Sequence, residues 1–406
     1  MKNRLIFLFY ANLVILFVGY GLFPLLPLYA TEFGATAGTV GIYLGLTYVA
    51  ISLGSMLPSW LPERISRKRL FLAASLVGIP ALALLGVATS LWQVAILTAA
   101  VWFSGGVGLA VSSVYTGMIS NQANQGRSFS LVSLSTPVAS LLGGLIVGQL
   151  VGAYGYRVMF LALAVWWVGL PLVVIFKLEN VQVSSGGNTA GTSDPAAQTT
   201  GYGFPLLLLA ALLVAGATSV GRMGASLSMQ ALAFSPQAVS STAAVSGLAM
   251  IPFILVQGAL SDRLGRRHFL TVGYLLSASG ALALMLAGQL WHFWLAMALL
   301  MIGRAVNDSM AAAVATELLP RPALPRALPR LKAMNWVAGV VSFAGAGYVM
   351  DALGINSVFI ALAAAAVIAA VVMSLLPGRN RPAPVANTST VPATVTAEAS
   401  PAATGC

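Results

Sequence analysis

The stretch GALSDRLGRRHFL, Gly258–Leu270, concentrates charge in a chain of 406 residues of which only 7% are charged. It lies between two long apolar runs, Ser240–Leu260 and Phe269–Gly288. A degenerate copy, SWLPERISRK, occupies Ser59–Lys68 and also lies between two apolar runs. Short basic loops between apolar runs are typical of the cytoplasmic side of membrane proteins. The surroundings of these two loops therefore decide the fold class.

The composition excludes an ordinary soluble domain. Hydrophobic residues make up 59% of the chain, whereas soluble domains are about 45–50% apolar and about 25% charged. The net charge of +11 would suggest a nucleic-acid partner if it formed one patch, but the basic residues are spread over short clusters, so we expect a lipid bilayer and no nucleic acid. The single cysteine, Cys406, excludes a disulfide within the chain and a cysteine metal site, and we expect no cofactor.

Twelve apolar runs are long enough to cross a membrane as helices, which takes about 20 residues. The first run follows MKNR and is too long for the apolar part of a signal peptide, about 7–15 residues, so we interpret it as a retained helix. Strands of a membrane barrel are much shorter than these runs. The predicted fold class is an all-α membrane protein of twelve transmembrane helices. The runs are Leu5–Ala30, Gly38–Pro58, Leu70–Ser90, Trp92–Met118, Phe129–Val151, Val158–Phe176, Pro205–Phe234, Ser240–Leu260, Phe269–Gly288, Trp291–Thr316, Ala333–Met350 and Val358–Leu376.

The predicted domain organisation is two bundles of six helices. Residues 1–180 form the first bundle and residues 204–376 form the second. The segment between them, 181–203, is rich in Gly, Ser and Thr and is expected to be a flexible cytoplasmic linker. Residues 377–406 are rich in Pro, Ala and Thr and are expected to be a disordered cytoplasmic tail.

The distribution of Lys and Arg predicts the orientation. If the twelve helices alternate in direction, 17 of the 20 basic residues fall on the side of the N-terminus. Only Arg157 falls on the other side, and Arg222 and Arg304 lie within helices. Because cytoplasmic loops carry the excess of Lys and Arg, both termini are expected to be cytoplasmic. We expect a multi-pass protein of the bacterial inner membrane, and a monomer.

The two charged loops also indicate an internal repeat. Glu63 and Asp262 are 199 positions apart, and this offset carries the first helix of the first set onto the first helix of the second. Two parallel repeats of six helices are a recurring transporter architecture.

At these residues the chain resembles the major facilitator superfamily, whose signature GxxxDRxGRR lies between helices 2 and 3, with a weaker copy between helices 8 and 9. The stretch Phe23–Thr36 is also similar to the end of helix 1 in the drug-exporter branch. The resemblance implies the superfamily fold and secondary transport. The second copy matches with Gly258, Asp262, Arg263, Gly265, Arg266 and Arg267, and the first keeps Arg64, Arg67 and Lys68, with Glu63 for aspartate and Ser59 and Ser66 for the glycines.

A gating role is predicted for both loops. Asp262 is expected to accept hydrogen bonds from the N-terminus of the helix that begins near Ser128, where the helix dipole favours an anion. By the same offset Glu63 is expected to face the helix that begins near Lys332. The arginines would hold these contacts and bind anionic lipid headgroups. The alternative is that both loops carry ordinary cytoplasmic charges with no gating role.

Three ionisable residues lie in helix interiors: Arg222, Arg304 and Asp308. Ionisable residues inside a membrane are functional candidates. Arg304 and Asp308 are four residues apart on one helix and are expected to pair. The pair either only sets the packing, or Asp308 takes and releases the proton that drives transport while Arg304 tunes it or holds substrate.

Arg222 lies between Gly221 and Gly224, which predicts a bent or unwound helix. It is about 14 Å along the helix axis from the level of Asp308, so we do not expect the two to pair. Arg222 either reaches the outer membrane interface or lines the outer part of a cavity and attracts anions.

Aromatic and amide side chains supply further candidates. Tyr20 and Trp102 could line a largely apolar cavity together with neighbouring aromatic residues, or they could face lipid or other helices. Asn307 is a candidate polar contact. The other residues in these two groups are Phe23, Phe103 and Tyr115, and Gln230, Gln257 and Asn335.

The predicted function is secondary active transport of a small organic molecule by alternating access, as a proton-coupled exporter of drug-like or amphipathic compounds. The alternatives are an organic-anion or sugar or metabolite carrier, and a transporter fold kept as a sensor without flux. An enzyme is disfavoured because the sequence has no phosphate-binding loop, paired carboxylates or metal-ligand cluster. Its two histidines, His268 and His292, lie near opposite ends of the helices.

Overall fold

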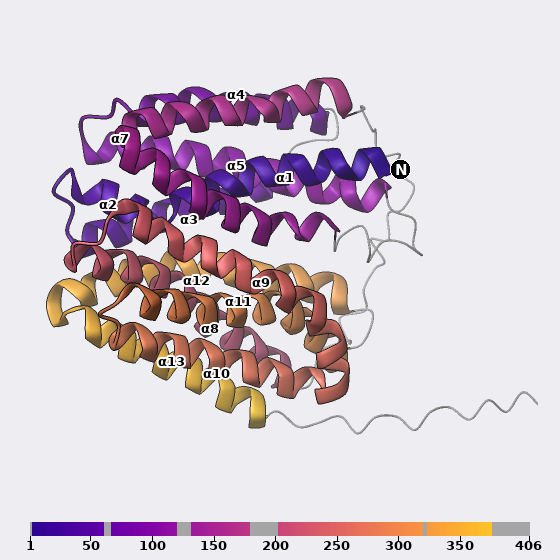
Figure 1. Cartoon of the computed structure of the whole chain (residues 1–406). Coiled ribbons are helices and arrows are strands. Elements are labelled where there is room, and N and C mark those ends of the chain that lie inside the picture. The colour runs from indigo at the N-terminus through magenta and orange to yellow at the C-terminus, as the bar shows by residue number, and fades with distance from the viewer. Residues whose placement is uncertain (1, 61–65, 120–130, 179–201, 320–322, 376–406) are drawn as a thin grey trace, which may run out of the picture. The chain divides into compact units, whose positions relative to one another are not determined.

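The computed structural model describes residues 2–60, 66–119, 131–178, 202–319 and 323–375, and long helices make up almost all of these ranges. No strand occurs in these ranges, so the all-α prediction is confirmed. The helices are α1 Lys2–Leu22, α2 Leu26–Thr31, α3 Ala37–Trp60, α4 Arg67–Leu85, α5 Leu91–Ile119, α7 Ser135–Lys177, α8 Gly203–Ala231, α9 Pro236–Leu264, α10 Arg266–Met285, α11 Leu290–Leu318, α12 Leu324–Leu353 and α13 Ile355–Leu375 (Figure 1).

The helices supply the membrane spans that the sequence predicts. Within the described ranges, eleven helices are long and apolar enough to cross a membrane. One of them, α7, holds two spans, because Gly155 has φ +77° and ψ 173° and interrupts the helical backbone. Only glycine adopts such a conformation without strain. The two parts of α7 match the predicted runs Phe129–Val151 and Val158–Phe176.

The first predicted run, Leu5–Ala30, is not one helix. Helix α1 ends at Leu22, a turn follows, and α2 begins at Leu26. Pro24 causes the break because proline has no backbone N–H to continue the helical hydrogen bonds. The N–H of Leu25 closes the turn by donating to the carbonyl of Leu22 at 2.8 Å. The turn places the Phe23 ring in the interior.

The predicted bend at Arg222 is wrong, because α8 is a continuous helix from Gly203 to Ala231. Its glycines serve close packing instead. A Cβ atom on Gly221 would lie 2.9 Å from the side chain of Leu300, and one on Gly224 would lie 2.6 Å from the ring of Phe359. These positions exclude a side chain because neighbouring helices already fill the space.

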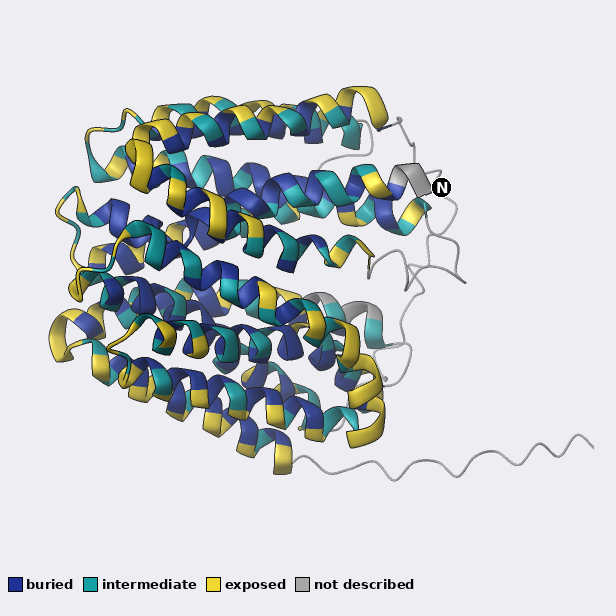
Figure 2. Cartoon of the chain, viewed as in Figure 1, coloured by how far each residue is buried: buried dark blue, intermediate teal, exposed yellow. Residues whose placement is uncertain are grey.

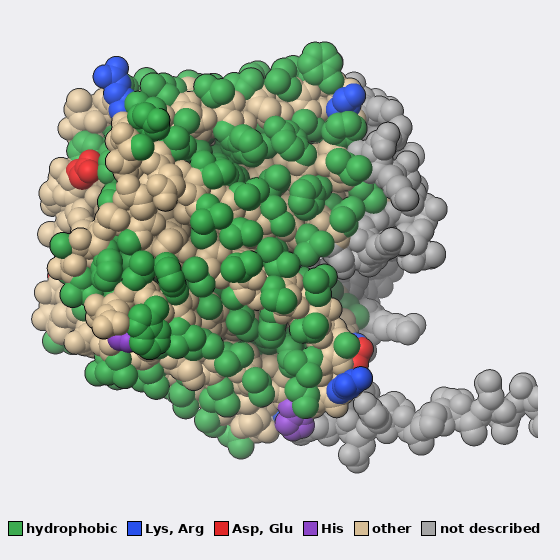
Figure 3. All heavy atoms as spheres, viewed as in Figure 1, with side chains coloured by type: hydrophobic (Ala, Val, Ile, Leu, Met, Phe, Trp, Pro, Cys, Tyr) green, Lys and Arg blue, Asp and Glu red, His purple; other side chains and the backbone are tan. Residues whose placement is uncertain are grey.

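The surface fits a lipid environment. In the view of Figure 3, hydrophobic side chains cover the middle of the visible face, and the charged side chains, drawn in blue and red, lie toward its two ends. Large apolar residues are exposed along the flanking helices, among them Val165, Phe176, Leu255 and Val341 (Figure 2). A soluble protein rarely exposes an apolar surface of this extent, so this belt is expected to contact lipid.

Two helix pairs join the first set of helices, α1–α7, to the second set, α8–α13. Helix α3 packs against α12, and α7 packs against α9. The backbones approach closely: a Cβ on Gly41 would collide with the carbonyl of Phe343, and one on Gly144 would collide with the backbone of Ala244. Small residues permit this approach between membrane helices.

The predicted offset of 199 relates these two interfaces contact by contact. Gly41 packs on Phe343 in one interface; their counterparts 199 positions away are Ser240 and Gly144, which pack together in the other. The offset also relates two turns with left-handed backbone, at Gly34 (φ +76°) and at Ala233 (φ +58°). The left-handed region is costly for alanine, so its presence at the counterpart of a glycine indicates a common backbone plan.

The described helices, α1 to α13, form one compact unit. The predicted division into residues 1–180 and 204–376 therefore stays a prediction. Most of the linker 181–203 and the whole tail 377–406 lie outside the described residues.

Candidate functional site

A central cavity of about 130 Å³ lies between the two sets of helices. Residues of α1, α3, α5 and α7 line it from one side, and residues of α8, α11 and α12 line it from the other. Five of the residues predicted from the sequence meet here: Tyr20, Phe23, Trp102, Arg222 and Arg304. The aromatic part of the wall consists of Tyr20, Phe23, Tyr48, Trp102, Trp167 and Trp336.

Arg222 points into this cavity and not toward the end of the helix. Its guanidinium carbon lies 3.7 Å from the centroid of the Phe23 ring and 5.2 Å from that of the Tyr20 ring. The Tyr48 hydroxyl also interacts with it. A cation over an aromatic face is stabilised by about 0.5–2 kcal/mol, more when water is excluded. The interpretation that Arg222 lines a cavity is therefore the one that the geometry supports.

Arg304 and Asp308 form the expected pair on α11. The Nε of Arg304 donates to Oδ2 of Asp308 at 2.9 Å, and 46% of the Asp308 side chain is exposed. The other carboxylate oxygen accepts from Nδ2 of Asn335 at 3.1 Å. Arg222 does not pair with Asp308 in the structure, as the axial spacing predicts.

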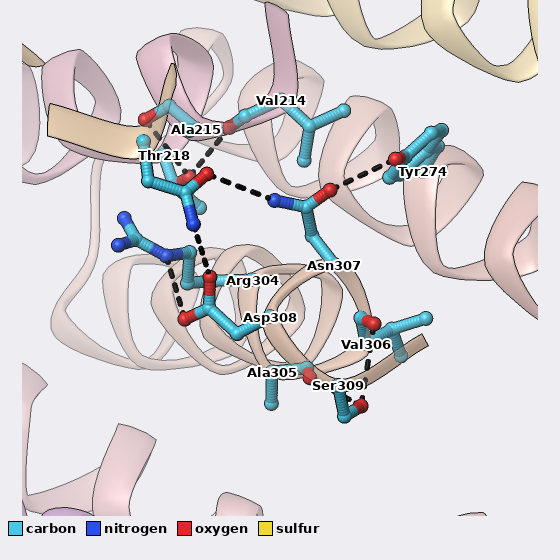
Figure 4. Close-up of polar contacts among 11 residues, drawn as sticks. Val214, Ala215, Thr218, Tyr274, Arg304, Ala305, Val306, Asn307, Asp308 and Ser309 are labelled. Atoms are coloured by element: carbon cyan, nitrogen blue, oxygen red, sulfur yellow. Dashed lines mark hydrogen bonds and ion pairs between the residues drawn. The ribbon is translucent and has the colours of Figure 1, made fainter. Parts of the chain in front are cut away.

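Asn307 connects this pair to the interior of the second set of helices (Figure 4). Its Oδ1 accepts from the Tyr274 hydroxyl at 2.8 Å, and its Nδ2 donates to Oδ1 of Asn335 at 3.4 Å. Asn307 is only 1% exposed, and a buried amide is costly unless its donors and acceptors are used. The network Tyr274–Asn307–Asn335–Asp308 thus holds the Asp308 carboxylate in place through its Oδ1.

The remaining polar candidates contact protein, away from the cavity wall. Gln257 accepts from the Ser309 hydroxyl at 3.0 Å, and Gln230 donates to the Thr31 hydroxyl at 2.6 Å. Thr31 and Gln230 are 199 positions apart, so here a residue meets its own counterpart in the repeat. The aromatic candidates Phe103 and Tyr115 do not line the cavity.

At one end of the helix bundle a hydrogen-bonded contact closes the gap between α3 and α12. The Thr36 hydroxyl and the Gly38 backbone N–H both donate to Oδ2 of Asp351, at 2.8 and 2.9 Å. Asp351 lies near the C-terminus of α12, and its carboxylate faces the N-terminus of α3, where a helix favours an anion. We call this contact the Asp351 clasp and this end of the bundle the Asp351 end.

We call the opposite end of the bundle, where the signature loop Gly258–Arg267 lies, the Asp262 end. The two sets of helices do not pack closely around this loop. A Cβ atom on Gly258 would meet no heavy atom within 4 Å. Asp262 is exposed and makes no hydrogen bond or ion pair to the described part of the chain. Gly265 has φ +82° and joins α9 to α10, so the tight turn expected at this glycine is present.

The basic residues of the loops bind their own set of helices. Arg266 pairs with Glu317 at 3.4 Å, and an amino group of Arg267 donates to the carbonyl of Met373 at 3.0 Å. In the first copy, Lys68 donates to the carbonyl of Ile175 at 3.0 Å and Arg67 lies 4.0 Å from the sulfur of Met118.

The gating contacts themselves stay a prediction. Arg263 is exposed beside Asp262. Glu63 and Arg64 lie outside the described residues, as does the segment near Ser128 that Asp262 is expected to contact. The predicted helix start near Lys332 is wrong, because the helix that contains Lys332 is α12 and begins at Leu324.

The sequence did not single out several residues of the site. Tyr48, Trp167 and Trp336 line the cavity, but aromatic residues are common on all faces of membrane helices, so periodicity gives no signal for them. Asp351 had a weak signal: it is one of nine acidic residues in the chain and it follows an apolar run. No group of three or more His, Cys, Asp or Glu that could hold a metal ion occurs among the residues with described placement.

Comparison with protein families gives the classification. Residues 8–220 and residues 206–402 each match the family model described as the Major Facilitator Superfamily. The chain belongs to this superfamily. Membership makes it a transporter and not an enzyme, and with its apolar spans it is a multi-pass integral membrane protein. The predicted family resemblance and the predicted all-α membrane fold are thus confirmed.

Other members of the Major Facilitator Superfamily are similar over most of the chain. Multidrug resistance protein MdtG of Salmonella arizonae is 27% identical over 313 residues, which is 73% of this chain and 75% of that protein. MdtG of Proteus mirabilis is 28% identical over the same share of each chain.

Solved structures of superfamily transporters share the fold. A POT family transporter in complex with a thioalcohol-conjugated peptide has a TM-score of 0.77 at 13% identity and covers 92% of this chain and 95% of its own. A bacterial homologue of the human lysosomal transporter Spinster has a TM-score of 0.70 at 12% identity, with coverage of 92% and 94%.

Proposed function

We propose that this chain is a secondary active transporter that exports small, drug-like amphipathic compounds from a bacterial cell, with protons as the driving ion. The central cavity carries the proposal, because helices of both sets line it and Arg304, which pairs with Asp308, lies at its wall. The similarity to proteins named for multidrug resistance supports export of this class of compound.

In this proposal the two sets of helices are two repeats of six spans. The pairs of contacts related by the offset of 199 support the repeat. The excess of basic residues supports cytoplasmic termini, which would place the Asp262 end in the cytoplasm and the Asp351 end outside. Modification of a cysteine placed in 181–203, in a Cys406→Ser background, tests this orientation: a membrane-impermeant reagent should not reach it in intact cells.

Alternating access requires each end to close in turn. The Asp351 clasp and the close α3–α12 and α7–α9 contacts would form the closed outer gate. Closure of the cytoplasmic end would bring Asp262 to the helix that begins near Ser128, and Glu63 to the N-terminus of α12. The carboxylates would then accept hydrogen bonds at those helix N-termini.

Asp308 is the proposed proton-coupling residue. It is the only acidic residue of the sequence in the interior of a predicted span, and 46% of its side chain is exposed. The ionised Asp308 carboxylate, beside Arg304, would accept hydrogen bonds from a bound substrate. Uptake of a proton on the outer side would remove the charge of Asp308 and favour release of the substrate, and loss of that proton to the cytoplasm would restore the site. Substrate and proton would thus compete for Asp308.

The test is transport of a fluorescent amphipathic dye in proteoliposomes under an imposed pH gradient. Asp308→Asn should abolish the response to the gradient, because an amide does not take up a proton at neutral pH, while dye binding to the purified variant should persist. Glu32→Gln is the matched control, because Glu32 is exposed at the end of α2 and does not line the cavity. Unchanged gradient-driven transport by Asp308→Asn would remove Asp308 from the mechanism. Binding of dye without flux in the unmodified protein would instead favour a sensor.

A further inference from the structure

The charges around the cavity do not balance. Arg304 has Asp308 as its counter-ion at 2.9 Å. Arg222 lines the same cavity, yet no carboxylate of the described residues lies within 4 Å of its guanidinium. Asp308 is the one acid of nine that is placed in a span interior, and it is already paired. The cavity therefore carries one positive charge that the protein does not neutralise.

The surroundings of Arg222 leave room for an anion. The Phe23 and Tyr20 rings lie over the guanidinium, and stacking of this kind covers a face of the planar group. Carboxylates and phosphonates bind at its N–H edge, through two parallel hydrogen bonds. A partly buried guanidinium without an anion is unfavourable, and the aromatic faces compensate for this only in part. An anion that enters the cavity would complete the site.

The rest of the wall suits an apolar body. Tyr48, Trp102, Trp167 and Trp336 contribute ring surfaces, and Ile15 and Met301 contribute aliphatic surface. The cavity volume of about 130 Å³ holds on the order of ten water-sized groups, which is the size of a small bicyclic molecule.

We infer that the transported compound is an amphipathic organic anion, with one carboxylate, phosphonate or sulfonate group bound by Arg222 and an aromatic or aliphatic body against the rings. The inference rests on the proposed transport function of the same cavity and specifies its substrate class. A cationic amphiphile is disfavoured, because the wall is positive and no described acidic side chain lines it.

Three probes with one ring system separate the possibilities: 2-naphthoate, 2-naphthylmethanol and 2-naphthylmethylamine. Their binding to the purified full-length protein is measured by quenching of tryptophan fluorescence, since three tryptophans line the cavity. We expect naphthoate to bind at least roughly tenfold more tightly than the alcohol, because a charge-assisted pair is stronger than a neutral hydrogen bond. The amine should bind more weakly than the alcohol. Equal binding of the three compounds, tighter binding of the amine, or no binding of naphthoate would overturn the inference.

Variants assign the effect to Arg222. Arg222→Gln should remove the preference for naphthoate over the alcohol, and Arg222→Lys should retain part of it because a cation without the planar fork remains. Arg69→Gln, at an exposed position of α4, is the control and should bind all three as the unmodified protein does. If Arg222→Gln does not fold, the Arg222→Lys variant and the binding of the three probes to the unmodified protein still test the inference. An unchanged preference in a folded Arg222→Gln variant would contradict the inference.

Flux separates this inference from the proposed function. Naphthoate that binds through Arg222 but is not moved in proteoliposomes would leave the site chemistry intact and contradict transport. Proton-driven export of the amine, insensitive to Arg222→Gln, would leave transport intact and overturn the anion specificity.

Discussion

Asn307 shows how one buried amide positions the charged pair. Both ends of the amide are used, since Tyr274 donates to its oxygen and its nitrogen donates to Asn335, which in turn donates to Asp308. The aspartate thus depends on a chain of side chains that reaches from α10 through α11 to α12. A substitution in this network should lower the free energy of unfolding more than it changes the coupling to protons.

Tyr274→Phe tests the network. The substitution leaves the buried oxygen of Asn307 without its donor, which costs about 1–3 kcal/mol of the free energy of unfolding. The midpoint of thermal unfolding in detergent should fall, and the affinity for substrate should fall less. Tyr154→Phe, at a residue that is 67% exposed, is the control and should leave the midpoint unchanged. Equal midpoints for the two variants would show that the Tyr274 hydrogen bond adds no stability.

The Asp351 clasp acts at the scale of helices. A single carboxylate oxygen accepts two hydrogen bonds at the N-terminus of α3, a helix of 24 residues. Hydrogen bonds to a charged group contribute about 1.5–3 kcal/mol each, and the dipole of α3 adds to this. The clasp is therefore strong enough to shift the equilibrium between open and closed forms of this end.

Asp351→Ala should favour opening of the Asp351 end by roughly tenfold or more, which corresponds to about 1.4 kcal/mol and is less than the cited contribution of the two bonds. Spin labels on cysteines at Thr39 and Ala352, in a Cys406→Ser background, report the separation of α3 and α12. A population at longer distance should appear in the variant. Thr36→Ser keeps a hydroxyl donor, so it should reproduce the unmodified distribution. The same distribution in Asp351→Ala would mean that the clasp does not hold the end closed.

The helices were largely predictable because lipid leaves the backbone few choices. A run of about 20 apolar residues must satisfy its own hydrogen bonds and forms a helix, so each predicted run contains a helix long enough to span. Local interruptions were less predictable. Pro24 breaks the first span, whereas Gly221 does not bend α8, because packing against Leu300 supports the helix. Glycine is ambiguous in sequence, since both a bend and a close contact require it.

The candidate site was predictable only where charge made it visible. Arg222, Arg304 and Asp308 stand out because ionisable residues in a membrane are costly. Tyr48 and Trp336 line the same cavity but share their residue types with lipid-facing positions. The Asp351 clasp joins residues 313 and 315 positions apart, and such a pairing depends on how the helices are arranged in space.

At the scale of the whole molecule, the two ends are packed to different degrees. At the Asp351 end, Gly144 lies against the backbone of Ala244. At the Asp262 end, Gly258 faces open space. A transporter that works by alternating access must open one end as it closes the other. Gly144 is therefore expected to be critical when the Asp351 end is closed, and Gly258 when the Asp262 end is closed.

Gly144→Leu and Gly258→Leu should therefore trap opposite states. The first cannot close the Asp351 end and should make a cysteine placed at Ser240, which is buried between α7 and α9, reactive to a membrane-impermeant maleimide. The second fits the present structure and should keep that cysteine protected. Transport should fall to background in both. Gly345→Leu, at an exposed position of α12 with no heavy atom within 4 Å of its Cβ, should transport normally. The same labelling pattern in the two variants would contradict an exchange of closed ends.

Two contacts join residues to their own counterparts: Thr31 to Gln230, and Phe23 to Arg222. In a chain that arose by duplication, a side chain at such a position initially faces its twin. Two guanidiniums at this separation would repel each other strongly in a medium that screens poorly. An arginine could persist at the centre only once the other copy had diverged there, here to phenylalanine. Divergence of the two halves along the symmetry axis was thus a precondition for any charged substrate pathway in this molecule.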